Sequence, residues 1–187
     1  MYRISMMARN SHSMGRELEL GEIYFSYGQL CVYDARPGQD LALDIKPDHI
    51  AQGFACSDSS AYLFHPLIQQ GVADVTLRIG QIPEVDTLRR EGFTRALAVP
   101  FEVRSGKLMV EGGPGEEGKD FALRFGVYKL VLAEKQIEEE RLAVTIFLEP
   151  CSASQDATVP SPTSTFLIWE GQRPAAARFT ADKLSLD

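Results

Sequence analysis

The sequence lacks any apolar run that approaches the roughly 18 residues needed to cross a bilayer, so no membrane-spanning role is expected. Its opening stretch, MYRISMMARNSHSMGREL, contains Arg3 and Arg9, but the continuous apolar segment that a secretory signal requires does not follow them. We therefore expect a cytoplasmic protein without membrane contact. Residues 1–16 are interpreted as a flexible leader or as the product of a wrongly assigned start codon.

Cysteine is scarce, and its placement indicates neither disulfides nor a zinc knuckle. Cys31, Cys56 and Cys151 cannot all pair within the chain, and none belongs to a Cys-x-x-Cys unit. Reduced thiols in a cytoplasmic protein are the expectation for this pattern.

Positive charge is in deficit: 19 Lys and Arg stand against 26 Asp and Glu, and the formal net charge is −7. A phosphate backbone is bound by clustered Lys and Arg, so direct nucleic-acid binding is not expected. A basic protein partner fits this charge better, although acidic surfaces also serve solubility alone.

Alternation with a period of two residues is the dominant pattern in this chain of 187 residues. In RALAVPFEVR (residues 95–104), Leu97, Val99 and Phe101 fall on one face, as a half-buried strand requires. Pro100 cannot donate a ladder hydrogen bond, which predicts an edge or a bulge there. Ser105-Gly106 then predicts a hairpin turn into KLMVE.

The remaining elements follow the same rule and predict an all-β protein, an antiparallel β-sandwich with few short helical turns. Residues 121–135 and 142–149 are expected to be antiparallel neighbours. The predicted domain is 17–172, with a flexible loop at 152–163 and a C-terminal tail at 173–187. Further strands are predicted in 17–34 (one strand, or two broken near Tyr27-Gly28), 72–79 and 164–170, and helical turns in 46–55 and 83–92.

Tyr128 follows Gly126 in FALRFGVYKLVL (residues 121–132), a spacing that occurs at sandwich corners where a tyrosine hydroxyl satisfies a nearby backbone group. The alternative is an ordinary strand tyrosine.

HIAQGFACSDSSAYLF (residues 49–64) gathers residues with chemical potential, and His65 follows it. Catalysis by a thiolate needs Cys56 beside an oriented base, either His49 or His65. The stretch lacks a nucleophile turn and a glycine-rich oxyanion segment, so no catalytic residue is predicted. The spacings of seven and nine residues match no metal-binding motif, so neither a metal nor another cofactor is predicted.

Two acidic segments, 111–120 and 134–140, are predicted to be loops. The first, EGGPGEEGKD, is rich in glycine, but its carboxylates disfavour a phosphate and no Gly-Lys-Ser/Thr follows. Carboxylates clustered at one end of a sheet imitate a phosphate string and steer association with a basic cleft. Simple solubilisation is the alternative.

Four segments together resemble the ComJ family, the competence protein J-like inhibitors of the DNA-entry nuclease. IYFSYGQLCVYD is similar to the family's opening strand, and HIAQGFACSDSSAYLF to its Gly-aromatic-Ala segment. LAVPFEVRSGKLMVE is similar to its VPFxV hairpin, and FALRFGVYKLVL to its FDLPxGxYxL strand. The similar segments run in order from about Glu19 to Glu149.

The resemblance implies a non-enzymatic protein that binds and occludes a DNA-entry-type nuclease, or an immunity protein against a related toxin nuclease. The partner would be a basic nuclease or toxin; no oligomeric state is predicted. The hypothetical contacts are surface carboxylates and aromatic anchors: Asp58, Glu111, Glu116, Glu117, Asp120, Glu138, Glu139, Glu140, Tyr27, Tyr33 and Tyr62, of which each tyrosine has a core position as its alternative.

Two other functions stay open. One is a small-molecule or carbohydrate-binding β-sandwich module whose pocket would be lined by Tyr24, Tyr62 and Trp169. The other is a hydrolase that depends on Cys56.

Overall fold

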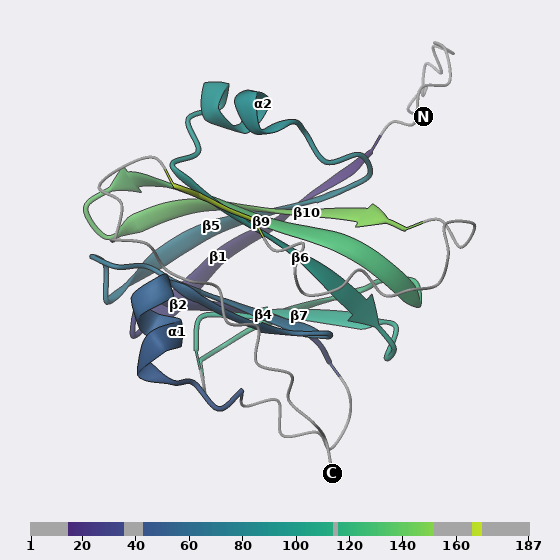
Figure 1. The fold of residues 1–187 in the computed structure, drawn as a ribbon, viewed down its shortest axis with the longest axis horizontal. Coiled ribbons are helices and arrows are strands. Elements are labelled where there is room, and N and C mark those ends of the chain that lie inside the picture. Colours follow the sequence, from purple (N-terminus) through teal and green to yellow (C-terminus); the bar gives the residue numbers. More distant parts are fainter. Residues whose placement is uncertain (1–14, 36–42, 114–115, 152–165, 170–187) are drawn as a thin grey trace, which may run out of the picture.

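The computed structural model describes residues 15–35, 43–113, 116–151 and 166–169, the last segment by its backbone. Two sheets stack face to face, and a short helix flanks each of them (Figure 1). The predicted β-sandwich with few helical turns is confirmed. The predicted leader up to residue 14, the loop 152–163 and the tail 173–187 lie outside the described residues, whereas Arg16 already belongs to a strand. Neither described helix is long and apolar enough to span a membrane.

One sheet has six strands in the order β1-β5-β10-β9-β6-β11, and the other has five in the order β3-β4-β2-β7-β8. The six-stranded sheet contains β1 (Arg16–Ser26), β5 (Gln70–Ile79), β6 (Arg95–Val103), β9 (Gly126–Glu138), β10 (Arg141–Pro150) and β11 (Phe166–Trp169). The five-stranded sheet contains β2 (Gln29–Asp34), β3 (Phe54–Ser57), β4 (Ser60–Phe64), β7 (Lys107–Glu111) and β8 (Lys119–Ala122). The helices are α1 (Pro47–Gln52) and α2 (Val85–Arg90).

The predicted pairing of β9 with β10 is confirmed, and the two strands are antiparallel. The break predicted near Tyr27-Gly28 separates β1 from β2, and these two strands belong to different sheets. The pair β5–β10 is parallel, unlike the rest of the sandwich. Parallel neighbours need a long crossover, which the intervening strands β6 to β9 supply.

The predicted hairpin through Ser105-Gly106 is wrong, because β6 and β7 lie in different sheets. A buried carboxylate holds this crossover: Asp34 is fully buried, and its Oδ1 accepts hydrogen bonds from the backbone N–H and the hydroxyl of Ser105 at 2.9 and 2.6 Å. Gly106 has φ 77°, a left-handed conformation that suits glycine. A turn signal in the sequence thus marks a change of sheet.

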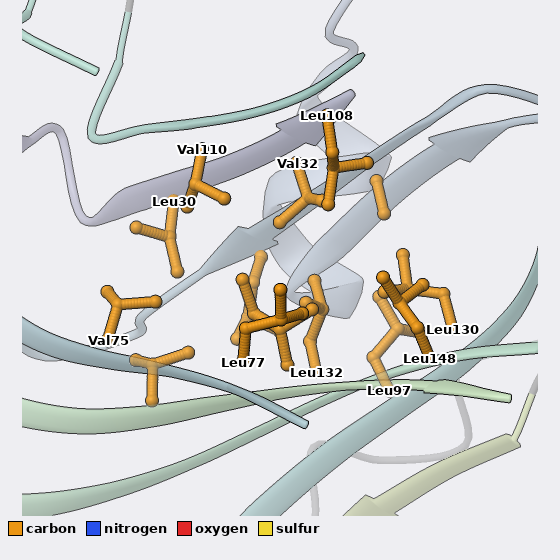
Figure 2. Packing of buried hydrophobic residues seen from close by; sticks show 14 of the residues in the cluster. Leu30, Val32, Val75, Leu77, Leu97, Leu108, Val110, Leu130, Leu132 and Leu148 are labelled. Carbon is orange, nitrogen blue, oxygen red and sulfur yellow. The ribbon is translucent and has the colours of Figure 1, made fainter. Parts of the chain in front are cut away.

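The core fills the space between the two sheets. Figure 2 shows side chains from both sheets pointing toward one another, among them Leu77, Leu132 and Leu108. All three are completely buried, and each such side chain contributes about 1.5–3 kcal/mol by leaving water. The alternation noted in the sequence is therefore the pattern that fills this layer.

Each sheet also buries part of its outer face. Leu88 of α2 and the neighbouring Phe93 pack on Phe147 of the six-stranded sheet. On the five-stranded sheet, the segment containing Leu43 and Ile45 packs against a cluster composed of Cys31, Ala55, Tyr62 and Phe64.

Two local predictions concern β6 and the start of β9. The Tyr128 hydroxyl donates to the carbonyl of Arg124 at 2.8 Å, which confirms the corner arrangement. Pro100 pairs with Lys129 on one side, whereas β11 accompanies only residues 95–98 of β6 on the other. Within the described strands, Pro100 therefore faces an open edge, as its missing N–H requires.

The strand directions divide the connecting loops between two ends of the sandwich. The β1–β2 turn, the β4–β5 loop, the β7–β8 loop and the β9–β10 turn meet at the end away from the β10 arrowhead in Figure 1. We call this the acidic end and define it as residues 27–28, 65–69, 112–118 without 114–115, and 138–140. The β3–β4 turn and the β6–β7 crossover lie at the opposite end.

Candidate functional site

The acidic end is held together by backbone hydrogen bonds between segments that are distant in sequence. These bonds fix the relative positions of its four connections, so the end is a single surface. They are Gly28 N–H to the carbonyl of Gln69 (2.7 Å), His65 N–H to Gly28 (2.6 Å), Ser26 N–H to Gly112 (3.1 Å) and Val72 N–H to Glu140 (3.0 Å).

Two glycines allow this close approach. A Cβ on Gly112 would lie 1.8 Å from the carbonyl oxygen of Tyr24, and a Cβ on Gly71 would lie 2.2 Å from that of Glu140. Both obstacles are backbone atoms that cannot rotate away. A side chain at either position would therefore push a connection of the acidic end away from β1 or β5.

Five of the predicted contact carboxylates gather at this end: Glu116, Glu117, Glu138, Glu139 and Glu140. In the described part of the chain, no ion pair involves any of the five. The nearby Arg141 does not neutralise them, because its guanidinium binds Asp74 at 2.6 Å and Glu22 at 2.5 Å. Among the described residues, the structure thus gathers carboxylates without ion pairs at one end, and these come from parts of the two acidic segments.

Three other predicted carboxylates are placed differently. Asp58 lies in the β3–β4 turn at the opposite end. Glu111 accepts a hydrogen bond from the Tyr33 hydroxyl at 2.8 Å. Asp120 lies within β8 and pairs with Lys107 at 2.6 Å. Glu111 and Asp120 therefore have intramolecular partners, and Asp58 is not part of the acidic end.

The three predicted tyrosines differ in exposure. Tyr27 in the β1–β2 turn is 79% exposed, so its ring is presented to solvent. Tyr33 is half-buried, and burial together with its hydrogen bond to Glu111 raises the pKa of its hydroxyl. Tyr62 is only 6% exposed and belongs to the cluster on the outer face of the five-stranded sheet. Tyr62 is therefore a core residue, the alternative that the sequence left open.

An open groove of about 460 Å³ lies between Tyr24 and the β9–β10 turn. Its walls also include Gln70, Gly71 and residues 138–141, so Arg141 lines it together with the three glutamates. Tyr62, predicted to share a carbohydrate pocket with Tyr24, does not line this groove. The side chain of Trp169 lies outside the described residues. The structure therefore does not assemble the proposed sugar pocket from the two tyrosines.

Cys56 is not arranged as a nucleophile. Burial, followed by the charge of Asp58, raises the pKa of its thiol to about 11, so the thiol stays protonated at neutral pH. Cys56 pairs with Ala61 on β4, four residues before His65, which is about 13 Å along a strand. Among the described residues, no hydrogen bond joins Cys56 to an imidazole, and no cluster of His, Cys, Asp and Glu is arranged to hold a metal.

Glu134, predicted to begin the second acidic loop, is instead buried in β9. Its carboxylate pairs with Arg95 of β6 at 3.0 Å, and both residues are 3% exposed. The Arg95 guanidinium also donates to the carbonyls of Gly53 and Phe64, which belong to the other layer. This pair ties the two layers together close to the acidic end. The sequence did not predict the Arg95–Glu134 pair, because Glu134 begins an acidic run and a charge count does not distinguish a paired carboxylate from a solvated one.

His65 anchors the β4–β5 loop of the acidic end. Its Nδ1 accepts the backbone N–H groups of Leu67 and Ile68 at 3.3 and 2.9 Å, so the ring must be neutral at that atom. Burial, followed by the charge of Arg95, lowers the pKa of His65 to about 4. Protonation of Nδ1 would turn this acceptor into a donor that faces the backbone N–H groups of Leu67 and Ile68. Both hydrogen bonds would be lost and the loop released.

We expect this histidine to make the protein sensitive to acid. The unfolded chain takes up a proton near pH 6.5, whereas the folded protein does so only near pH 4, so His65 lowers stability as pH falls through this window. His65→Asn keeps an acceptor oxygen without titrating there. Urea denaturation at several pH values should give a shallower decline for the variant. Acidic side chains lower the stability of both proteins at low pH, so some decline is expected in each. If the free energy of unfolding of the wild type and of His65→Asn fell equally with pH, the role of His65 would be contradicted.

Comparisons with known proteins identify a family and two solved structures that resemble this chain. The family model described as "Competence protein J (ComJ)" matches residues 22–149. The crystal structure of ComJ from Bacillus subtilis, described as an inhibitor of the DNA degrading activity of NucA, superimposes with a TM-score of 0.59 at 18% identity, covering 74% of this chain and all of that one. A second structure, "Crocagin biosynthetic gene J", gives a TM-score of 0.45 at 13% identity over 71% of this chain and 97% of that one. A comparison with curated proteins finds no significant match.

The family match covers more than half of the chain, from β1 through most of β10, and includes every described loop of the acidic end. The superposition spans the whole of the Bacillus subtilis chain. This chain therefore belongs to the competence protein J family.

Proposed function

We propose that this protein is a non-enzymatic inhibitor that binds a DNA-degrading nuclease and covers its active-site cleft. The observation that carries the proposal is the concentration of five carboxylates at one end of a rigid sandwich: Glu116, Glu117 and residues 138–140, none of which forms an ion pair with another described residue. A nuclease binds the phosphate backbone with Lys and Arg, so its cleft attracts such an end. The relative from Bacillus subtilis, described as an inhibitor of NucA, supports this class of partner.

Inhibition by occlusion requires no chemistry from this chain. The protonated thiol of Cys56 and its distance from His65 support a binding role. The three free cysteines support action in the cytoplasm, where thiols remain reduced. An immunity role against a related toxin nuclease would use the same acidic end.

The test is a titration of nuclease activity. The purified protein is added to the nuclease of its own genome that most resembles NucA, and the degradation of DNA is followed. We expect inhibition that is complete near one equivalent and does not depend on preincubation time. Cys56→Ser should inhibit equally. Activity that persists at a large molar excess would overturn the proposal, and loss of nuclease activity at a small fraction of one equivalent would indicate an enzyme instead.

Charge reversal of the β9–β10 turn tests the electrostatic contribution. The triple variant Glu138→Lys, Glu139→Lys and Glu140→Lys should slow association with the nuclease by about 10–100-fold at low salt, because steering by opposite charge is lost. Stopped-flow kinetics at 20 and 300 mM salt should show the difference shrinking as salt screens the charges.

The matched control is Asp120→Asn, which removes a carboxylate already paired with Lys107 within β8. Its association rate should stay within about twofold of the wild type, because it changes the net charge by one unit outside the acidic end, whereas the triple variant changes it by six units within that end. Unchanged kinetics in the triple variant would remove the β9–β10 turn from the interface.

A further inference from the structure

The acidic end also carries the most exposed large apolar side chains of the described residues. Leu67 and Tyr27 lead that group at 81% and 79% exposed, ahead of Phe125 at 72%. Tyr24, on β1 just before the acidic end and beside the groove, adds a third ring that is 49% exposed. Soluble proteins scatter single apolar residues over their surfaces, but apolar groups gathered within a polar rim mark interaction sites. We call Leu67, Tyr27 and Tyr24 the apolar patch.

The members of the patch are fixed relative to one another by the backbone. The β1–β2 turn with Tyr27 and the β4–β5 loop with Leu67 are joined by the hydrogen bonds of Gly28 to Gln69 and His65. Tyr24 precedes the same turn on β1. Rigid presentation lowers the entropy lost on binding, so such a patch is suited to anchor a partner.

Tyr27 is held in a backbone conformation that disfavours its residue type. Its φ is 56°, and Tyr27 is the only residue other than glycine with positive φ in the part of the chain that the structure describes. The following Gly28 has φ 66°, so the turn suits Asn, Asp or Gly at both positions. A bulky residue in this region is strained by about 1 kcal/mol or more. The ring lies in solvent, so contacts within the protein do not offset this strain.

We propose that the apolar patch is the anchor of the interface with the nuclease, inside a rim formed by Glu116, Glu117 and residues 138–140. This inference rests on the proposed function and adds which surface supplies the binding energy. The charge of the rim selects the occupant, because a basic nuclease complements it, whereas a second copy of this chain would bring a like-charged rim. The groove beside Tyr24, about 460 Å³, is lined by residues 138–141 and fits a Lys or Arg side chain of the nuclease, because the guanidinium of Arg141 is already bound to Glu22 and Asp74.

Aromatic anchors act mainly after the two proteins have met. Substitutions in the apolar patch should therefore change the dissociation rate, whereas substitutions in the acidic rim should change the association rate. Tyr27→Asn should weaken binding to the nuclease at least about 30-fold, mostly through faster dissociation, because the central aromatic residues of interfaces carry most of their energy. The same variant relieves the strained turn, so its stability in urea should equal or exceed that of the wild type. If Tyr27 had a purely structural role, its replacement would not weaken binding while leaving stability in urea unchanged or higher.

The experiment compares three variants by surface plasmon resonance with the same nuclease, and each is also unfolded in urea. Leu67→Ser should weaken binding by about tenfold or more. Phe125→Ser is the control, because Phe125 is 72% exposed but follows β8 at the opposite end; its Kd should stay within about twofold of the wild type.

The outcomes separate the two proposals. If the wild-type protein fails to inhibit, the proposed function is lost. If it inhibits while Tyr27→Asn and Leu67→Ser bind with wild-type Kd, the function stands and the apolar patch is not the anchor. Sedimentation showing a wild-type dimer that Tyr27→Asn dissociates would assign the patch to a second copy of this chain and overturn the inference.

Discussion

Replacing Arg95 with methionine is expected to lower the free energy of unfolding by about 3–5 kcal/mol, because it leaves the buried carboxylate of Glu134 without its cation. The carbonyls of Gly53 and Phe64 lose a donor at the same time. The Gly53 carbonyl still accepts the backbone N–H of Phe64 at 2.8 Å, so the cost of a lost acceptor bond, about 1–3 kcal/mol, falls mainly on the carbonyl of Phe64. Urea denaturation at pH 7 measures the loss.

The double variant Arg95→Met and Glu134→Leu should recover part of this loss, since it removes the isolated charge. It should remain below the wild type because the two carbonyls still lack the guanidinium. Lys107→Met is the control: it breaks the exposed pair with Asp120, and its effect should be at most about 1 kcal/mol. A similarly small effect for Arg95→Met would show that the buried pair does not join the two layers.

The pH dependence of Arg95→Met has a defined sign. Burial raises the pKa of Glu134, and Arg95 opposes that shift in the wild type. Without Arg95, the folded variant retains a proton that the unfolded chain releases, so its stability should fall as pH rises above the ordinary range of a glutamate. A loss that is independent of pH between 5 and 8 would contradict this.

Replacing Gly112 with alanine is expected to lower the free energy of unfolding by about 3 kcal/mol, the upper part of the range for overpacking. The added Cβ would lie 1.8 Å from the oxygen of Tyr24 and 2.5 Å from the Cα of Phe25, so β1 and β7 must separate. The β7–β8 loop would move with β7, and binding of the nuclease should weaken as well.

The control for this substitution is Gly21→Ala. Gly21 has φ 83°, but its added Cβ would meet nothing within 4 Å, so only the backbone strain of about 1 kcal/mol is expected. Equal losses for the two variants in urea would mean that the contact between β1 and Gly112 relaxes without resistance.

Local patterns predicted much of this fold. Alternation identified the faces of β5, β6 and β10, and the Gly-x-Tyr spacing identified the corner at Tyr128, because both depend on neighbours along one strand. The turn signal at Ser105-Gly106 was assigned to a hairpin because its partner, Asp34, lies far away in sequence. Only packing shows that the chain changes sheets there.

The candidate site was predicted in outline. Parts of the two acidic segments lie at the same end: Ser26 N–H holds Gly112 beside β1, and Val72 N–H holds Glu140 beside β5, the neighbour of β1. Leu67 was not identified, since a leucine between Pro66 and Ile68 in PLIQQG gives no alternating pattern that separates exposed from buried. Its neighbour Ile68 is 6% exposed, so a shift of one position decides which side chain faces solvent.

By itself, the sequence determined most of the strands, though not β3, β4 or the start of β8, which fell in segments without clear alternation. It also determined the sign of the net charge and the resemblance to the competence protein J family, because these follow from composition and ordered motifs. Within the described part of the chain, tertiary structure alone decided which carboxylates lie at the surface without an ion pair and which bind a partner. Glu134 is buried against Arg95, Asp58 lies at the opposite end, and residues 138–140 lie beside Tyr24. The reason is physical: the environment of a charge depends on contacts between residues distant in the chain, and those contacts exist only after the two sheets have packed.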